Sequence, residues 1–252
     1  MPHMHFPAPL RSRLGALRSC AAALALLAAA PGAALAQLTV NRSVIEFSPD
    51  APIQDIELSN TGEFRLYLDL NVAQIRNPES ESPVREPLDD PRTAPVLVTP
   101  KQLVLPPGER KRVRVVMREV DADRDRVFRL SVKPYTGSVQ VAGGETGDRS
   151  SAVKILVAYD LLLLSRPARP APRLGVTRTD RTIEFRNEGN TNILLRKVSQ
   201  CDVLRRECAE LPANRLYVGE TWKVELPVAG PAASYPVDVY SAVGLRNEHA
   251  VY

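Results

Sequence analysis

The sequence predicts an all-β protein made of two β-sandwich domains behind a cleaved signal peptide. Short segments in which apolar and polar residues alternate, as in half-buried strands, occur along the chain with turn residues between them. No stretch after residue 36 has the apolar period of an amphipathic helix. A proline-rich stretch at residues 166–172 separates two sets of predicted strands. We therefore expect domains at residues 37–166 and 167–252.

The first 36 residues have the layout of a secretory signal peptide. Three arginines precede an apolar run over residues 20–30, and Ala34-Leu35-Ala36 follows as a cleavage signal. The run is shorter than the roughly 20 apolar residues that span a bilayer, so we expect cleavage after residue 36 and no stable membrane insertion. Cys20 starts the run, whereas a lipid-attachment cysteine would follow it, so a lipoprotein is not expected.

The charge balance argues against a nucleic-acid partner. The whole chain has 33 basic and 29 acidic residues. Residues 1–36 contain three arginines and no acidic residue, so the rest of the chain keeps 30 basic residues against 29 acidic ones. Without a basic surplus, the electrostatic attraction on which nucleic-acid binding depends is missing.

Two cysteines, Cys201 and Cys208, remain after the signal peptide, together with a single histidine, His249. In an oxidising compartment an even pair of cysteines predicts a disulfide. A tetrahedral metal site would need a carboxylate in addition to these three side chains. The sequence therefore predicts a Cys201–Cys208 disulfide and no metal site.

The predicted strands follow one another with turns between them. Residues 53–58 alternate apart from one slip at Gln54-Asp55, and the polar, proline-rich residues 77–95 are predicted to form a loop. In the first domain the strands are expected at residues 38–40, 53–58, 66–72, 96–98, 103–105, 112–116 and 127–132. In the second domain they are expected at residues 182–185, 193–195, 222–226 and 237–240.

Residues 151–165 (SAVKILVAYDLLLLS) form the longest strand candidate, directly before the proline-rich stretch. Both of its faces are largely apolar, although a strand of an antiparallel sandwich usually needs only one apolar face. Two interpretations stay open: the strand is buried on both sides at the domain junction, or one row of side chains is kept for a partner that adds a strand beside it. That row consists of Val153, Ile155, Val157, Tyr159, Leu161 and Leu163.

Several motifs stand in a defined order along the chain. They are Val98-Thr99-Pro100, the stretch QLVLPPG at 102–108, the basic strand 110–116, DRVFRL at 125–130, LSRP at 164–167 and Asn187-Glu188-Gly189-Asn190. In this order and spacing the chain resembles the PapD-like periplasmic pilus-assembly chaperones over essentially its whole length after the signal peptide.

The resemblance implies two immunoglobulin-like domains in a boomerang arrangement. It also implies a periplasmic chaperone, without catalytic residues or cofactors, that binds pilin subunits lacking their final strand and delivers them to an outer-membrane usher. The long strand would complete the subunit fold, and the residues expected to bind the subunit are Val153, Ile155, Val157, Tyr159 and Leu161. Self-association of free chains through this strand edge stays open.

The chain departs from the family pattern at the expected cleft. Members carry an arginine in the first strand and a lysine late in the long strand, which bind the terminal carboxylate of the subunit. Val44 and Leu162 stand at these two positions. The candidate anchors are therefore the nearby bases Arg42 and Lys154.

The resemblance also implies an ion pair between the domains. Arg166 stands at a family position with this structural role, and Asp125 is the candidate partner.

Two other classes of function were alternatives to the chaperone. Catalysis usually needs a histidine or paired carboxylates in a cleft, but the single histidine lies three residues from the end, so no enzyme is expected. A secreted adhesin or structural pilus subunit is also a β-sandwich. Such a subunit should lack one strand and carry a donor segment at its start, whereas this chain contains the strands of a full first sandwich.

Overall fold

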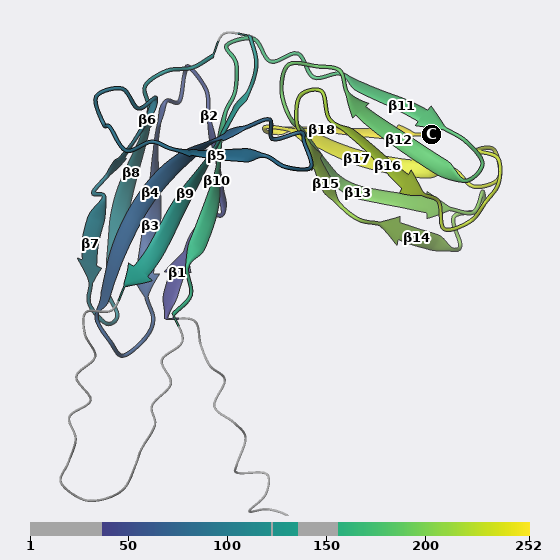
Figure 1. Cartoon of the computed structure of the whole chain (residues 1–252). Coiled ribbons are helices and arrows are strands. Elements are labelled where there is room, and N and C mark those ends of the chain that lie inside the picture. Colours follow the sequence, from purple (N-terminus) through teal and green to yellow (C-terminus); the bar gives the residue numbers. More distant parts are fainter. Residues whose placement is uncertain (1–36, 122, 136–155) are drawn as a thin grey trace, which may run out of the picture. The chain divides into compact units, whose positions relative to one another are not determined.

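The computed structural model of the chain describes residues 37–121, 123–135 and 156–252 (Figure 1). Over these residues the structure is all-β, with eighteen strands in four sheets. The predicted fold class, two β-sandwiches, is confirmed: two sheets are built from strands before the proline-rich stretch and two from strands after it. No strand lies between residues 166 and 173.

The first sandwich consists of a four-stranded and a six-stranded sheet. The four-stranded sheet has the order β1 (Leu38–Val40), β3 (Ile53–Asn60), β8 (Arg110–Met117), β6 (Val96–Thr99). The six-stranded sheet has the order β2 (Val44–Phe47), β10 (Tyr159–Ser165), β9 (Arg126–Tyr135), β4 (Leu66–Arg76), β5 (Val84–Pro87), and β7 (Gln102–Leu105) also pairs with β4. All the neighbouring pairs are antiparallel except β10 with β2, which run parallel.

The two sheets of the first sandwich close over one hydrophobic core. Because side chains alternate across a strand, alternate residues along much of β4 and β8 are buried in this core. Leu66, Leu68 and Leu70 of β4 are buried in this way, as are Val113 and Val115 of β8. The slip in the alternation near the start of β3 also has an explanation: Ile53 pairs with Val116 on the outer face and is half exposed.

The second sandwich has a three-stranded and a five-stranded sheet with a separate core. The three-stranded sheet has the order β11 (Leu174–Arg178), β12 (Thr182–Asn187), β16 (Thr221–Glu225). The five-stranded sheet has the order β14 (Cys208–Leu211), β13 (Ile193–Cys201), β17 (Val237–Val243), β18 (Arg246–Val251), and β15 (Asn214–Leu216) also pairs with β13. Its core includes Phe185, which stacks on Trp222 with ring centroids 5.7 Å apart.

Two elements differ from the sequence-based expectation. The predicted loop at 77–95 contains strand β5, whose four residues are all exposed and therefore show no apolar alternation. The predicted strand at 151–165 corresponds to β10, which begins at Tyr159. Residues 151–155 lie outside the described residues.

Candidate functional site

The second half of β10 is buried on both of its faces. Leu161 and Leu163 point into the core between the sheets of the first sandwich. Leu162 and Leu164 point to the other face, where they pack with Val127. For residues 161–164 the interpretation of a strand buried on both sides is therefore the correct one. Leu161 is 1% exposed and belongs to the core, which leaves it no surface for a partner.

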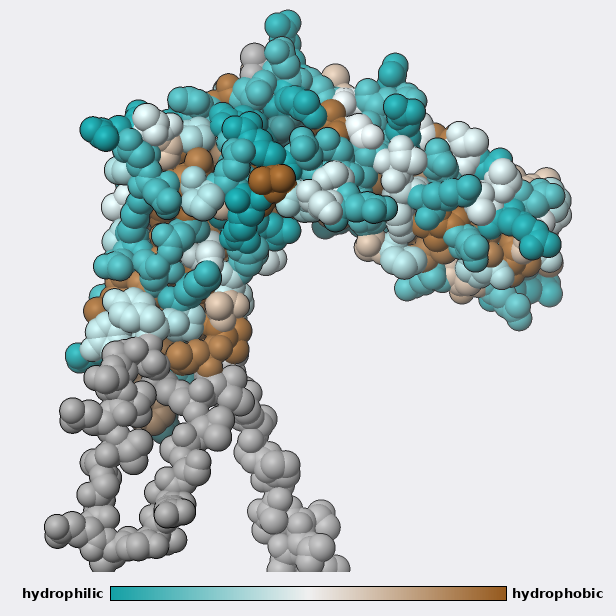
Figure 2. Space-filling model, in the orientation of Figure 1, coloured by the Kyte–Doolittle hydropathy of each residue, from teal (hydrophilic) through white to brown (hydrophobic). Residues whose placement is uncertain are grey.

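The residues just before β10 are more accessible. Val157 is 37% exposed and Ala158 is also exposed. Tyr159 is half buried: its ring packs against the core, and its hydroxyl donates a 2.7 Å hydrogen bond to the carbonyl oxygen of Leu38. Figure 2 shows hydrophobic surface at the end of the first sandwich where β10 begins. Val153, Ile155 and Lys154 lie outside the described residues.

One side of β10 is covered by β2 only in part. The parallel pairing runs from Val44 opposite Leu162 to the ends of both strands. The Leu162 amide donates to the Ser43 carbonyl oxygen at 2.9 Å and so points to the β2 side. Successive amides of a strand alternate in direction, so an amide two residues from Leu162 points to the same side. The amide of Asp160 therefore points to the same side, ahead of the point where β2 begins. Over the described residues, β10 has no partner strand on this side before Leu162.

Val44 and Leu162, the two positions where the resemblance led us to expect charged anchors, are direct neighbours on the outer face of this sheet. Leu162 is 8% exposed and Val44 is 37% exposed. The residue opposite Leu162 on its other side is Arg129 of β9. Because directly opposed residues point to the same face, these three side chains form one row across β2, β10 and β9.

Arg129 belongs to a small charged cluster on this face that the sequence did not reveal. Its guanidinium donates to the Asp160 carbonyl oxygen at 3.3 Å and lies 3.8 Å from the Asp160 carboxylate. Arg85 of β5 binds the same carboxylate with two hydrogen bonds of 2.6 and 3.2 Å. Two guanidinium groups share one carboxylate, so the cluster carries a surplus positive charge. The Arg129 side chain is 36% exposed, so its guanidinium can donate hydrogen bonds to a further carboxylate from a partner.

Arg42, a candidate anchor from the sequence, bonds to the sheet of the first sandwich that does not contain Arg129. Its guanidinium contacts Gln54 Oε1 at 3.4 Å and the carbonyl oxygen of Asp55, both on β3 in the opposite sheet. Arg42 therefore joins the exposed charged face of that sheet, where Asp55 also pairs with Arg114.

Arg166 connects the two sandwiches, as expected, but through another partner. It binds the Glu46 carboxylate with two hydrogen bonds of 3.0 Å, and it also donates to Thr191 Oγ1 at 2.5 Å in the second sandwich. Glu46 is the residue opposite Leu164 on β2, which brings its carboxylate to the end of β10. The pair expected from the sequence, Asp125 with Arg166, is replaced by Glu46 with Arg166.

Asp125 crosses the same junction through a different contact. Its Oδ2 accepts hydrogen bonds from the backbone amide of Asn192, at 2.6 Å, and from the Asn192 side chain. Burial raises the pKa of Asp125, and the hydrogen bonds from Asn192 and the positive charge of Arg166 oppose this rise. Asp125 and Arg166 thus lie near each other and fasten the two sandwiches by separate bonds.

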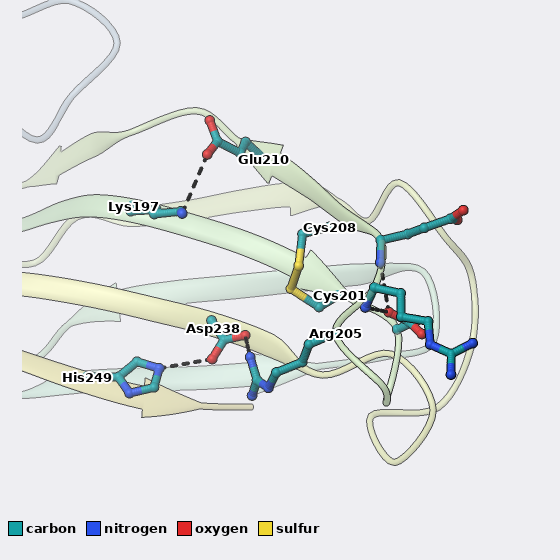
Figure 3. The surroundings of a disulfide bond; sticks show 10 residues. Lys197, Cys201, Arg205, Cys208, Glu210, Asp238 and His249 are labelled. Atoms are coloured by element: carbon teal, nitrogen blue, oxygen red, sulfur yellow. Dashed lines mark hydrogen bonds and ion pairs between the residues drawn. A yellow bond between two sulfur atoms is a disulfide. The ribbon is translucent and has the colours of Figure 1, made fainter.

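The Cys201–Cys208 disulfide is present and joins β13 to β14 (Figure 3). It closes the hairpin that carries Arg205, whose guanidinium pairs with Asp238 of β17. His249 of β18 contacts the other oxygen of the same carboxylate at 2.9 Å. The prediction of this disulfide is confirmed.

Two kinds of feature are not found in the described part of the chain. Within it, no group of three histidine, cysteine, aspartate or glutamate side chains is arranged to hold a metal ion. Among the same residues, no helix has the length and apolar character needed to cross a membrane.

Comparisons with known proteins identify the family. Residues 37–171, just over half of the chain, match the family model of the pili and flagellar-assembly chaperone, PapD N-terminal domain. No curated protein sequence matches the chain.

Chaperones are among the solved structures that share this fold. The Class 5 fimbriae chaperone CfaA has a TM-score of 0.61 at 14% identity, over 85% of this chain and 97% of that one. The Pseudomonas aeruginosa CupB2 chaperone has a TM-score of 0.56 at 11% identity, over 84% and 98%. A structure of Salmonella enterica SafA pilin in complex with the SafB chaperone has a TM-score of 0.57 at 14% identity, over 86% and 97%. This chain therefore belongs to the PapD family of pili and flagellar-assembly chaperones, a non-enzymatic family whose role is in pilus assembly.

Proposed function

We propose that this chain is a periplasmic chaperone that binds pilin subunits by strand addition and delivers them to an outer-membrane usher. In this proposal, residues 1–36 are a signal peptide that is removed on export. The observation that carries the proposal is that, among the residues the structure describes, one side of β10 has no partner strand before Leu162. The pilin partner class is that of the SafB chaperone, which was solved with SafA pilin.

The open side of β10 can pair with an incoming strand through its backbone. The amide of Asp160 points there, and each further hydrogen bond of this kind contributes about 0.5–1.5 kcal/mol. Backbone pairing gives affinity, and pockets for alternate side chains give specificity. Val157, exposed just ahead of the strand, would offer an apolar side chain to the subunit, and the row continues by sequence to Ile155 and Val153.

Arg129 is the proposed anchor for a carboxylate of the subunit. It lies beside Leu162 on the outer face and shares Asp160 with Arg85, so the face keeps a net positive charge. A guanidinium fork held in place by a neighbouring carboxylate loses little freedom when it binds a second one. In this chain the charge would come from β9, which is next to the strand of Leu162 and two strands from that of Val44.

Co-expression with candidate small secreted pilin subunits tests the proposal. We expect one of them to co-purify with the chain at one to one from the periplasmic fraction, and the mature chain to begin at Gln37 by mass spectrometry. Finished fibres should lack the chain. Recovery of the chain within fibres would make it a structural subunit or adhesin, and the absence of any complex would remove the strand-addition proposal.

A further inference from the structure

The turn between β17 and β18 carries a leucine that is fully exposed in the described structure. Val243 pairs with Arg246, so Gly244 and Leu245 are the two residues of a tight hairpin turn. Gly244 has a φ of 59°, which suits the first central residue of a type II′ turn. Such a turn places no demand for an apolar side chain on its second central residue. Leu245 nevertheless occupies it and is 100% exposed.

This turn lies against the ion pair at the end of β10. A Cβ atom added to Gly244 would lie 3.7 Å from Arg166 Nε and 3.7 Å from Glu46 Oε2. Glu46 lies two residues along β2 from Val44 and therefore points to the same outer face. The turn therefore lies on the outer face, two residues along β2 from Val44, at the end of β10 that β2 covers.

We infer that Leu245 is a contact residue for the pilin subunit bound along β10, so that the second sandwich takes part directly in subunit binding. This inference rests on the proposed function. The pilin is the occupant that the position favours, because the turn lies next to the outer face on which the open side of β10 and Arg129 are found. Gly244, the residue before Leu245, lies against Glu46, which is two residues along β2 from Val44, so a subunit in contact with Val44 would lie near this turn.

The geometry of the turn also favours tight contact. A two-residue turn between paired strands is already ordered, so a partner that buries Leu245 does not have to immobilise a loop. A single exposed leucine is common on protein surfaces, and exposure alone would carry no argument. Leu245 differs from the other exposed apolar residues of the second sandwich because its turn partner, Gly244, lies beside Glu46 and Arg166.

Leu204 provides a matched control in the same sandwich. It is 63% exposed and lies in the turn closed by the Cys201–Cys208 disulfide. β13 and β17 are antiparallel, with Leu194 opposite Ala242 at one end and Gln200 opposite Val237 at the other. Leu204 and Leu245 therefore lie at opposite ends of the five-stranded sheet.

The experiment compares Leu245→Asp and Leu204→Asp for binding to the subunit that the wild-type chain retains in co-purification. Leu245→Asp is expected to weaken binding on the order of tenfold or more, the loss typical of a buried interface contact. Leu204→Asp should bind like the wild type. Both variants should unfold at the wild-type urea midpoint, because neither side chain is buried.

A second readout uses a photo-crosslinking amino acid at each position. Position 245 is expected to crosslink to the subunit and position 204 is not. The inference would be overturned if the wild type binds the subunit, Leu245→Asp binds it equally well and position 245 does not crosslink. That result would leave the strand-addition proposal intact. A wild-type chain that retains no subunit would instead overturn the proposed function, and this inference with it.

Discussion

Val44 of β2 and Leu162 of β10 are direct partners in the parallel strand pair of the first sandwich. Two apolar side chains thus meet on the outer face of the sheet where the family resemblance led us to expect two bases. The nearest base in the same row is Arg129, which lies opposite Leu162 on β9. The positive charge of this face therefore comes from β9, next to the strand of Leu162 and two strands from that of Val44, and Asp160 and Arg85 hold it there.

Replacement of Arg129 should weaken subunit binding. We expect Arg129→Ala to raise the Kd about tenfold, because a charge-assisted hydrogen bond to a carboxylate contributes about 1.5–3 kcal/mol. Isothermal titration of the purified subunit measures the effect, which should shrink as salt is added. Arg42→Ala is the control, since Arg42 is bonded to β3 in the other sheet. A larger loss for Arg42→Ala than for Arg129→Ala would assign the anchor to Arg42 instead.

Val157→Asp tests whether the start of the long strand contacts the subunit. Val157 is exposed in the free chain, so the variant should fold normally and lose most of its subunit binding, because a charge would enter an apolar groove. Circular dichroism and co-purification measure folding and binding separately. Leu163→Asp is the contrasting variant: Leu163 is fully buried, so this change should unfold the first sandwich. Normal binding by a folded Val157→Asp variant would argue against subunit contact at this residue.

Glu46→Gln tests the ion pair between the sandwiches. Arg166 is 7% exposed, and removal of the Glu46 carboxylate would leave a buried guanidinium without its ion-pair partner. We expect a loss of about 3 kcal/mol in the free energy of unfolding, as for other broken buried pairs. Urea denaturation measures it. Glu57→Gln is the control, because its pair with Arg110 is exposed and should contribute less than 1 kcal/mol. Equal, small effects of both changes would mean that the hydrogen bonds of Arg166 to Thr191 and Asn192 are enough to stabilise its buried guanidinium without Glu46.

The alternation of apolar residues predicted most of the strands because it follows from burial of one face. It predicted β4, β8 and β9 directly. β5 had no such signal, since all its residues are exposed and it forms only by pairing with β4. The same limit applies to β10. Leu161 packs in the core of the first sandwich and Leu162 packs in the separate cluster on the other face, but both are leucines, so the sequence does not distinguish the two environments.

The candidate site could be predicted only where sequence neighbours determine it. The Cys201–Cys208 disulfide joins two ends of one hairpin and followed from the cysteine count. Arg129 was visible as the polar position between Phe128 and Leu130, and hence as outward-facing. Its role required the register that places it opposite Leu162, residues far apart in the chain. The partner of Arg166 was missed for the same reason, because the pairing of β2 with β10 supplies Glu46.

Loss of the disulfide should destabilise the second sandwich. The bond links residues seven positions apart, and closing so short a loop stabilises the fold by about 2–3 kcal/mol in the chain-entropy model. We expect Cys201→Ser with Cys208→Ser to lower the free energy of unfolding by this amount, measured by urea denaturation. Reduction of the wild type by dithiothreitol should have the same effect, and should not alter the double variant. A double variant as stable as the oxidised wild type would show that the hairpin is held by its other bonds.

Asp238 should make the second sandwich sensitive to acid. Burial alone would raise the pKa of this carboxyl, but hydrogen bonds from Arg205 and His249 outweigh burial, and its pKa lies below the usual 3.8. A carboxyl with a lowered pKa in the folded state stabilises the fold above its unfolded pKa, and this contribution is lost as the pH falls through the folded value. We expect Asp238→Asn to cost about 2 kcal/mol at pH 7, the size of hydrogen bonds to a charged group.

The difference between wild type and Asp238→Asn should then shrink as the pH falls below about 4, since protonation removes the same charge that the substitution removes. Urea midpoints at several pH values between 7 and 3 measure this convergence, and other carboxyls cancel because both proteins contain them. Arg205→Gln in the same series should reduce the convergence, because Arg205 is the stronger of the two groups that lower the pKa of Asp238. A constant difference across the whole range would show that Asp238 contributes through packing and neutral hydrogen bonds and that its charge has no part in stability.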